Sequence, residues 1–300
     1  MDEPALGTER VLRATASPTL AGDWALVLAS AGIAHKIVEG GGAFSIVVDA
    51  PDASPAAEAL AAFDVESVPV VVPPAPDLGP SALGVMSAAV LLAMFFVAGP
   101  RDVSTPSRWF DVGSASAAQI IHGQWWRAVT ALTLHADVLH VAGNVIACLL
   151  FISAVGRWLG PGLGAALIVG TASIANGLTA LWHRADFVSV GASTATFASI
   201  GLVAGLQLVR RWRYDVRRRY VWLPLGAALG LFAMLGTGAQ ADVGAHLFGL
   251  GVGAAVGTGV AGAGLRAPGR LGQALLIALV SAVLVGAWTL AFRSSGRGPA

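Results

Sequence analysis

The sequence predicts an all-α polytopic membrane protein with a small soluble α+β domain at its N-terminus. Of its 300 residues, 56% are hydrophobic and only 12% are charged, whereas a soluble domain is about half apolar and about a quarter charged. Residues 1–80 hold eleven acids and three bases, a balance of −8, and residues 81–300 hold fifteen arginines and six aspartates, a balance of +9. This composition excludes an ordinary soluble enzyme and a disordered chain, and it indicates that the two parts face different surroundings.

We interpret residues 1–72 as a small cytoplasmic domain of helices and strands. Apolar residues at helical spacing predict helices, and short β-branched runs around a triple glycine predict a hairpin. The predicted helices lie at 19–33 and 54–63, and the predicted strands at 35–38, 44–48 and 68–72. Prolines within 73–80 predict a stiff linker. The N-terminus is acidic and lacks an apolar run, so we expect no cleavable signal peptide.

Seven apolar stretches follow the linker, and a helix of about 20 residues is enough to cross a bilayer. The stretches lie near 82–98, 138–156, 161–181, 193–209, 221–237, 244–263 and 271–291. The long connection after the first stretch carries Trp109, Trp125 and Trp126. Tryptophans in such a connection are typical of an aromatic belt at the membrane–water interface.

Arginines predict the orientation of these spans. The loops after the second, fourth and sixth spans hold nine arginines, and the opposite loops and the tail hold six. Because cytoplasmic loops carry the excess of basic residues, we expect the nine arginines and the acidic N-terminal domain in the cytoplasm. The C-terminus of a chain with seven spans then lies outside, and the expected location is the cell membrane.

A serine and a histidine at the outer ends of two spans are candidate functional residues, because polar groups at membrane depth are costly. Ser193 opens the fourth span and His246 opens the sixth, and both spans run in the same direction. Alone, such a serine commonly bonds to its own helix, and such a histidine to a neighbouring helix. Together they lie at a similar depth, where a hydrogen bond between them would activate a serine nucleophile.

Small residues predict a close approach of these two helices. They repeat every four residues on one face of each span, at Gly201 and Gly205 and at Gly249, Gly253 and Gly257. Such faces let helix backbones come near one another.

The second span opens with a further polar group of His135, His140 and Asn144. His140 and Asn144 are four residues apart and share a helix face. Two side-chain donors beside a serine suit a developing oxyanion. A structural polar cluster and a metal site are the alternatives, although no further acid, histidine or cysteine completes a ligand set.

Four motifs follow one another along the chain: Gly123-Gln124-Trp125-Trp126-Arg127 with Thr130, then His135, His140 and Asn144, then Gly191-Ala192-Ser193 with Phe197, and finally Ala245-His246 with Gly249 and Gly253. In this order they resemble the motifs of the rhomboid family of intramembrane serine proteases, over roughly residues 81–265. Each motif alone is weak evidence for the resemblance, and the ordered set is strong evidence. The resemblance implies a six-helix catalytic core, with a seventh helix and a tail in residues 266–300. The N-terminal domain loosely resembles small cytoplasmic domains that precede the core in some bacterial members.

The resemblance implies hydrolysis of a peptide bond in or near a transmembrane segment of another protein. Ser193 would be the nucleophile, and His246 the general base and then the general acid, as a dyad without a third member. His140, Asn144 and the backbone N–H of Ser193, beside Gly191, would hold the oxyanion and the substrate. Supporting positions are Phe197 against the imidazole, Arg127 in the long loop, and His135, Trp126, Gly249 and Gly253. Residues 236–241 would form a lid over the site.

Two positions depart from the family pattern. Thr194 and Ala198 stand where the family usually has glycine. A β-branched residue beside the nucleophile is expected to crowd the helix contact or to change how the oxyanion is held.

Two other functions compete with proteolysis. A rhomboid-like protein that binds membrane clients without cutting them is favoured by Thr194. A polytopic transporter would place polar groups near the bilayer midplane, whereas here they gather at one end. We expect transmembrane substrates and the lipid bilayer as partners, with no cofactor, no metal ion and no nucleic acid. The substrate, its cleavage site and the oligomeric state do not follow from the sequence.

Overall fold

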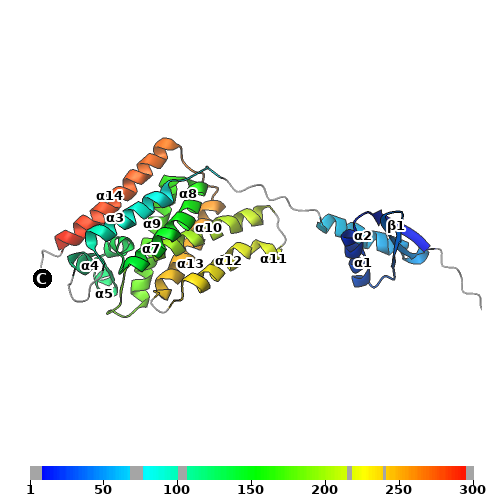
Figure 1. Cartoon of the computed structure of the whole chain (residues 1–300), viewed down its shortest axis with the longest axis horizontal. Coiled ribbons are helices and arrows are strands. Elements are labelled where there is room, and N and C mark those ends of the chain that lie inside the picture. The colour runs from blue at the N-terminus through cyan, green and yellow to red at the C-terminus, as the bar shows by residue number, and fades with distance from the viewer. Residues whose placement is uncertain (1–8, 68–76, 101–106, 215–217, 239–240, 295–300) are drawn as a thin grey trace, which may run out of the picture. The chain divides into compact units, whose positions relative to one another are not determined.

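The fold is given by a computed structural model, which describes residues 9–67, 77–100, 107–214, 218–238 and 241–294 (Figure 1). The chain forms two compact units, Met1–Val71 and Val72–Ala300. The first unit combines helices with a small sheet, and the second is a bundle of helices.

The N-terminal unit is an antiparallel sheet of three strands with two helices packed on it. Its elements are β1 (Glu9–Thr15), α1 (Pro18–Ser30), β2 (Lys36–Gly40), β3 (Ala43–Asp49), η1 (Ala50–Asp52) and α2 (Ala53–Ser67). The strand order is β1-β3-β2. Leu28 of α1, Ile46 of β3 and Leu60 of α2 are fully buried in its core.

The predicted hairpin is confirmed, and one strand is additional. Gly41 and Gly42 have φ of 61° and 80°, as a tight two-residue hairpin turn requires. β1 pairs with β3 from Glu9 to Thr15, with a register shift between Val11 and Arg13, although its mixed charged and apolar residues did not predict a strand. The strand predicted at 68–72 lies outside the described residues.

Each of the seven predicted apolar stretches contains a helix of the second unit. These helices are α3 (Leu83–Ala98), α7 (Val138–Ala147) continued by the π-helical turn η3 (Cys148–Ile152) and α8 (Ser153–Leu159), α9 (Pro161–Trp182), α10 (Ser193–Arg213), α12 (Leu223–Leu235), α13 (Val243–Gly262) and α14 (Arg270–Ser294). A short helix, α11 (Arg218–Val221), precedes α12.

Four of the described helical segments are long and apolar enough to cross a membrane by length and composition. They are Val138–Leu159, Pro161–Trp182, Val243–Gly262 and Arg270–Ser294. α3 and α12 are shorter apolar helices, with 16 and 13 residues. α12 is shorter than predicted because Pro224 lies in its first turn, where proline favours a helix start. α10 has 21 residues but is not among these four segments. Hydroxyl side chains at its start and arginines at its end lower its mean hydropathy.

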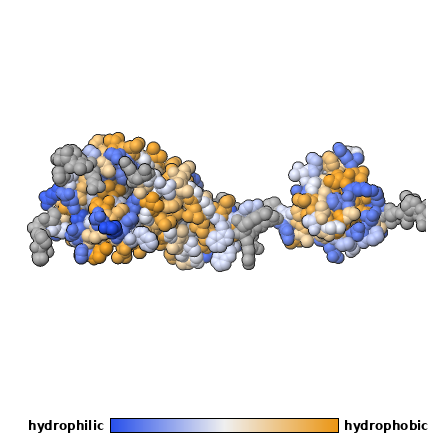
Figure 2. Space-filling view, turned by 90° about the horizontal axis from the view of Figure 1, so that it is seen from below, coloured by the Kyte–Doolittle hydropathy of each residue, from blue (hydrophilic) through white to orange (hydrophobic). Residues whose placement is uncertain are grey.

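Large apolar side chains cover much of the surface of the second unit (Figure 2). Phe96, Leu139, Leu150 and Leu271 are among those that are exposed. Extensive exposed apolar surface marks contact with a membrane. The second unit is therefore the membrane-embedded part of a multi-pass protein.

The long connection between α3 and α7 is folded onto the bundle. It contains α4 (Arg108–Gly113), β4 (Ala115–Ser116), α5 (Ala117–Ile121), α6 (Arg127–Thr130) and η2 (Ala131–Thr133), and β4 pairs with β5 (Val188–Ser189). The buried Arg127 guanidinium donates to the backbone oxygens of Ser114 at 3.0 Å and Asp111 at 2.9 Å, and to Gln124 Oε1 at 2.7 Å. One side chain thus ties three parts of the connection together.

The last helix is attached to the bundle near both of its ends. Gln273 Oε1 accepts from the N–H groups of Gly162 at 2.6 Å and Leu163 at 3.0 Å, and its Nε2 donates to the Leu159 oxygen at 2.9 Å. Near the other end of α14, Trp288 Nε1 donates to Thr133 Oγ1 at 3.2 Å. α14 therefore contacts the α8–α9 corner and the segment that leads to α7.

Glycines bring α10 and α13 into backbone contact, as their spacing predicted. A Cβ added at Gly253 would lie 2.3 Å from the Ala198 oxygen, and one at Gly249 would lie 2.7 Å from the Thr194 oxygen. Gly201 and Gly205 of α10 lie equally close to α13, and opposite Thr194 and Ala198 the room is supplied by glycines on α13. For this reason Thr194 and Ala198 do not prevent the close contact, contrary to the crowding expected from them.

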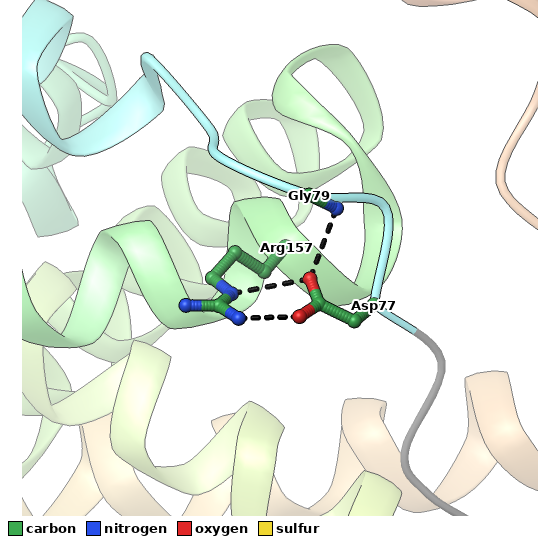
Figure 3. A network of polar contacts seen from close by, with 3 residues as sticks. All are labelled: Asp77, Gly79 and Arg157. Carbon is green, nitrogen blue, oxygen red and sulfur yellow. Dashed lines mark hydrogen bonds and ion pairs between the residues drawn. The ribbon is translucent and has the colours of Figure 1, made fainter.

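The chain that enters α3 is held against the end of α8 (Figure 3). Asp77 pairs with the Arg157 guanidinium and accepts from the Gly79 N–H at 2.9 Å. The Leu78 N–H donates to the Arg157 oxygen at 2.8 Å. These contacts fix the start of the membrane unit.

Candidate active site

Ser193 and His246 are hydrogen-bonded at the same end of the α10–α13 pair. Ser193 Oγ lies 2.8 Å from His246 Nε2. Ser193 is the first residue of α10, and His246 lies in the first turn of α13. Asp242 begins α13 by accepting the Ala245 N–H on Oδ1 at 2.9 Å, so it caps the helix and does not serve the imidazole.

The imidazole of His246 is held on its other edge and on its face. Its Nδ1 lies 3.0 Å from the backbone oxygen of Gly236. Because a carbonyl oxygen only accepts, Nδ1 carries the proton and Nε2 is free to accept from the Ser193 hydroxyl. The Phe197 ring lies against the imidazole, with the centroids 4.5 Å apart. The histidine is thus fixed in the tautomer that a general base needs.

The turn before Ser193 is held by the segment that precedes α7. The Gly191 N–H donates to the Ala131 oxygen at 2.9 Å, and the Ala192 N–H donates to His135 Nε2 at 3.4 Å. Gly191 has φ of 128°, a conformation that favours glycine. The nucleophile therefore follows a backbone turn whose position is set by hydrogen bonds.

His140 and Asn144 lie beside this turn. A Cβ added at Gly191 would lie 2.6 Å from His140 Nε2 and 3.8 Å from Asn144 Nδ2. The ring centroids of His135 and His140 are 5.1 Å apart, and Asn144 Nδ2 donates to the His140 oxygen at 3.1 Å. Two side-chain donors therefore face the backbone directly before the serine.

His135 is neutral at physiological pH in this setting. Burial, and then the proximity of His140, lower its pKa from an ordinary 6.5 to about 4. A neutral ring keeps Nε2 as the acceptor for the Ala192 N–H.

The remaining predicted site residues are farther from the chemistry. Trp126 and Arg127 belong to the folded connection, where the indole N–H of Trp126 is buried without a partner among the described residues. Gly249 and Gly253 contribute space for the helix contact. Within the described residues, no group of three or more His, Cys, Asp or Glu side chains could hold a metal ion.

Two backbone oxygens were missed from the sequence. The Gly236 oxygen orients His246, and the Ala131 oxygen holds Gly191. Every residue carries a carbonyl, so its type gives no signal of such a role. Only Gly236 was noted, as part of a predicted lid.

The fold and the site define a class: a multi-pass membrane protein with a hydrogen-bonded serine–histidine pair near one end of its helices. The family model of the rhomboid domain matches residues 122–263. YdcA of Bacillus subtilis (strain 168), which is assigned to the rhomboid proteases, is 30% identical over 142 residues, covering 47% of this chain and 70% of YdcA. The chain belongs to the rhomboid family. The rhomboid protease GluP of the same organism is 30% identical over 124 residues, covering 41% of this chain and 24% of GluP.

Proposed function

We propose that this protein is an intramembrane serine endopeptidase that cleaves membrane proteins in or near their transmembrane segments. The observation that carries the proposal is the 2.8 Å contact between Ser193 Oγ and His246 Nε2, with the opposite edge of the imidazole on the Gly236 oxygen. A nucleophile, a base and a group that orients the base are the three parts that serine catalysis requires. Here the third part is a backbone carbonyl.

In the proposed reaction, Ser193 Oγ attacks the carbonyl carbon of the scissile bond while His246 Nε2 takes the hydroxyl proton. The protonated His246 then gives this proton to the leaving amine, and an acyl-enzyme on Ser193 remains. Water, activated by the same Nε2, hydrolyses the ester and restores the serine.

The oxyanion of the tetrahedral intermediate would be held beside Gly191. His140, Asn144 and the N–H of Ser193 supply donors there. Loss of one such donor costs about 2.7–4 kcal/mol in barrier height, or about 10²–10³ in kcat. The lack of a Cβ at Gly191 leaves the space that the oxyanion needs.

We propose the cell membrane as the location, with the arginine-rich ends of α10 and α13 in the cytoplasm. The loops at that end carry nine arginines against six at the other end and in the tail, and positive residues favour the cytoplasmic side. The serine–histidine pair then lies toward the outer face. Transmembrane proteins are the proposed substrates.

The test is cleavage of a reconstituted transmembrane substrate whose helix contains destabilising residues. Ser193→Ala and His246→Ala are expected to lower kcat by a factor on the order of 10⁴–10⁶. Ser199→Ala is the matched control, because Ser199 lies on the same helix and its hydroxyl donates only to the Ala195 oxygen of that helix. Equal cleavage by all four proteins would refute the proposal.

A fluorophosphonate probe separates proteolysis from client binding. The wild type and Ser199→Ala are expected to be labelled, whereas Ser193→Ala is not. Folded wild-type protein that neither reacts with the probe nor cuts the substrate, yet retains it, would favour the client-binding function.

A further inference from the structure

A basic pocket lies at the end of the bundle opposite to Ser193. It is bounded by the ends of α8, α10 and α13 and has a volume of about 540 Å³. Its charged and aromatic lining consists of Trp158, Arg210, Arg213, Tyr214 and Arg266. Ser193 begins α10, and Arg210 and Arg213 lie in its last turn, so this pocket is distinct from the candidate active site.

The pocket is rich in positive charge, and none of the described residues that line it is acidic. Arg213 Nη2 donates to the backbone oxygen of Gly262 at 2.8 Å, which orients the guanidinium without neutralising it. Arg210 lies over the Trp158 ring, 5.9 Å from its centroid, and donates to Gln207 Oε1 at 3.0 Å. Arg266 follows α13 and is exposed. Three guanidinium groups therefore line the pocket, and the groups of Arg210 and Arg213 are oriented by hydrogen bonds.

The rest of the lining is apolar. It includes Leu78, Leu159, Leu206 and Leu265. The neighbouring Asp77 pairs with Arg157 (Figure 3). Leu78 is held in place by this pair and by its own N–H, which donates to the Arg157 oxygen. The nearby Arg157 is therefore engaged with a carboxylate, whereas no carboxylate among the described lining residues faces Arg213 and Arg266.

We propose that this pocket binds the headgroup of an anionic phospholipid such as phosphatidylglycerol. Guanidinium groups bind phosphate through paired hydrogen bonds, and basic pockets between membrane helices bind anionic lipid headgroups. Leu78 and Leu265 of this apolar lining are exposed, so they could contact acyl chains. A free phosphate ion would make no favourable contact with the apolar lining, so a lipid is the occupant that fits both kinds of lining residue.

A bound lipid would contact the ends of α8, α10 and α13 and hold them together. α10 and α13 carry Ser193 and His246, so the lipid would stabilise the helix pair that holds the candidate dyad. Because a ligand that binds only the folded state raises stability by mass action, an effect on unfolding is expected whether or not the protein cleaves substrates. The inference does not depend on the proposed protease activity.

The test uses the full chain in a neutral detergent, titrated with phosphatidylglycerol or with phosphatidylcholine. Phosphatidylglycerol is expected to raise the thermal unfolding temperature, and phosphatidylcholine is not. Arg266→Gln is expected to weaken the apparent affinity for phosphatidylglycerol about fivefold, and Arg213→Gln/Arg266→Gln about 25-fold, from roughly 1 kcal/mol per basic residue. Arg266→Lys, which keeps the charge, is expected to retain most of the affinity.

Arg184→Gln is the matched control, because Arg184 is an exposed arginine that follows α9 at the Ser193 end and pairs with Asp186. It should leave the titration unchanged. The proposal is overturned if Arg184→Gln weakens binding as much as Arg266→Gln, since the effect would then be one of net charge. It is also overturned if sodium phosphate or poly-glutamate gives the same stabilisation as the lipid, or if Arg213→Gln/Arg266→Gln binds like the wild type. Unfolding temperatures without lipid show that each variant folds.

Discussion

Gly253 of α13 lies against the backbone oxygen of Ala198 of α10, where an added Cβ would come within 2.3 Å of that oxygen. Gly257 stands in the same relation to Leu202, at 2.2 Å. The two helices that carry Ser193 and His246 therefore touch through their backbones. The hydrogen bond between the two side chains depends on this separation.

Gly253→Ala should push α10 and α13 apart. A backbone oxygen cannot move aside as a flexible side chain can, and overpacking costs about 1–3 kcal/mol. We expect a lower unfolding temperature and a loss of cleavage. Gly251→Ala is the control, since a Cβ there meets nothing within 4 Å and alanine is favoured over glycine in a helix by about 0.5–1 kcal/mol. The unfolding temperature in detergent is measured for both variants. An equal change in the two would contradict the backbone contact.

Gly191→Ala should abolish activity with only a modest loss of stability. Its Cβ would lie 2.6 Å from His140 Nε2, and the φ of 128° strains any residue with a side chain. We expect kcat to fall by at least the 10²–10³ that loss of an oxyanion donor costs. Gly143→Ala, on the exposed side of α7 where a Cβ meets nothing within 4 Å, should behave as the wild type. If Gly191→Ala kept the kcat of the wild type, the turn at Gly191 would not be part of the oxyanion site.

Trp288→Phe should uncouple α14 from the segment before α7. The substitution keeps a ring beside Trp109 and Phe292 but removes the donor to Thr133 Oγ1. One hydrogen bond contributes about 0.5–1.5 kcal/mol. A double-mutant cycle with Thr133→Val measures the coupling, and Trp182→Phe, at an exposed tryptophan of α9, is the control. Additivity within about 0.3–0.5 kcal/mol would show that the bond contributes nothing.

Acid should destabilise the protein through His135. Its pKa is about 4 when folded and 6.5 ordinarily, so the unfolded chain binds its proton at a higher pH. The stabilisation from the neutral ring is fully present above about pH 6.5 and is lost as the pH falls toward 4. Unfolding temperatures between pH 7.5 and pH 5 should fall more steeply for the wild type than for His135→Gln. The exposed His122→Gln should follow the wild type, and parallel curves for all three would contradict the assignment.

The candidate dyad could be predicted because its residues are conspicuous in an apolar chain. A serine and a histidine at the same end of two parallel spans, with glycines every four residues behind them, leave few other arrangements. The groups that orient the site could not be predicted in this way. The oxygens of Gly236 and Ala131 act through the backbone, and a backbone atom has no residue type.

The effect of Thr194 and Ala198 was also beyond the sequence alone. Whether a side chain crowds a helix contact depends on what faces it. Here Gly249 and Gly253 face the oxygens of these two residues, so the space is supplied from the partner helix. Similarly, β1 could not be recognised before its partner β3 was known, because its own residues are half polar.

The attachment of α14 near both ends has a mechanical consequence. The apolar stretch at 271–291 is about as long as the hydrocarbon layer, which is about 30 Å thick, so a thinner or thicker bilayer would change the tilt of α14. Gln273 ties one end to the α8–α9 corner, and Trp288 ties the other to Thr133. A change in bilayer thickness that altered this tilt would pull on Thr133, two residues from the histidine that holds the turn before Ser193. We therefore expect the thickness of the membrane to affect the position of the turn before Ser193.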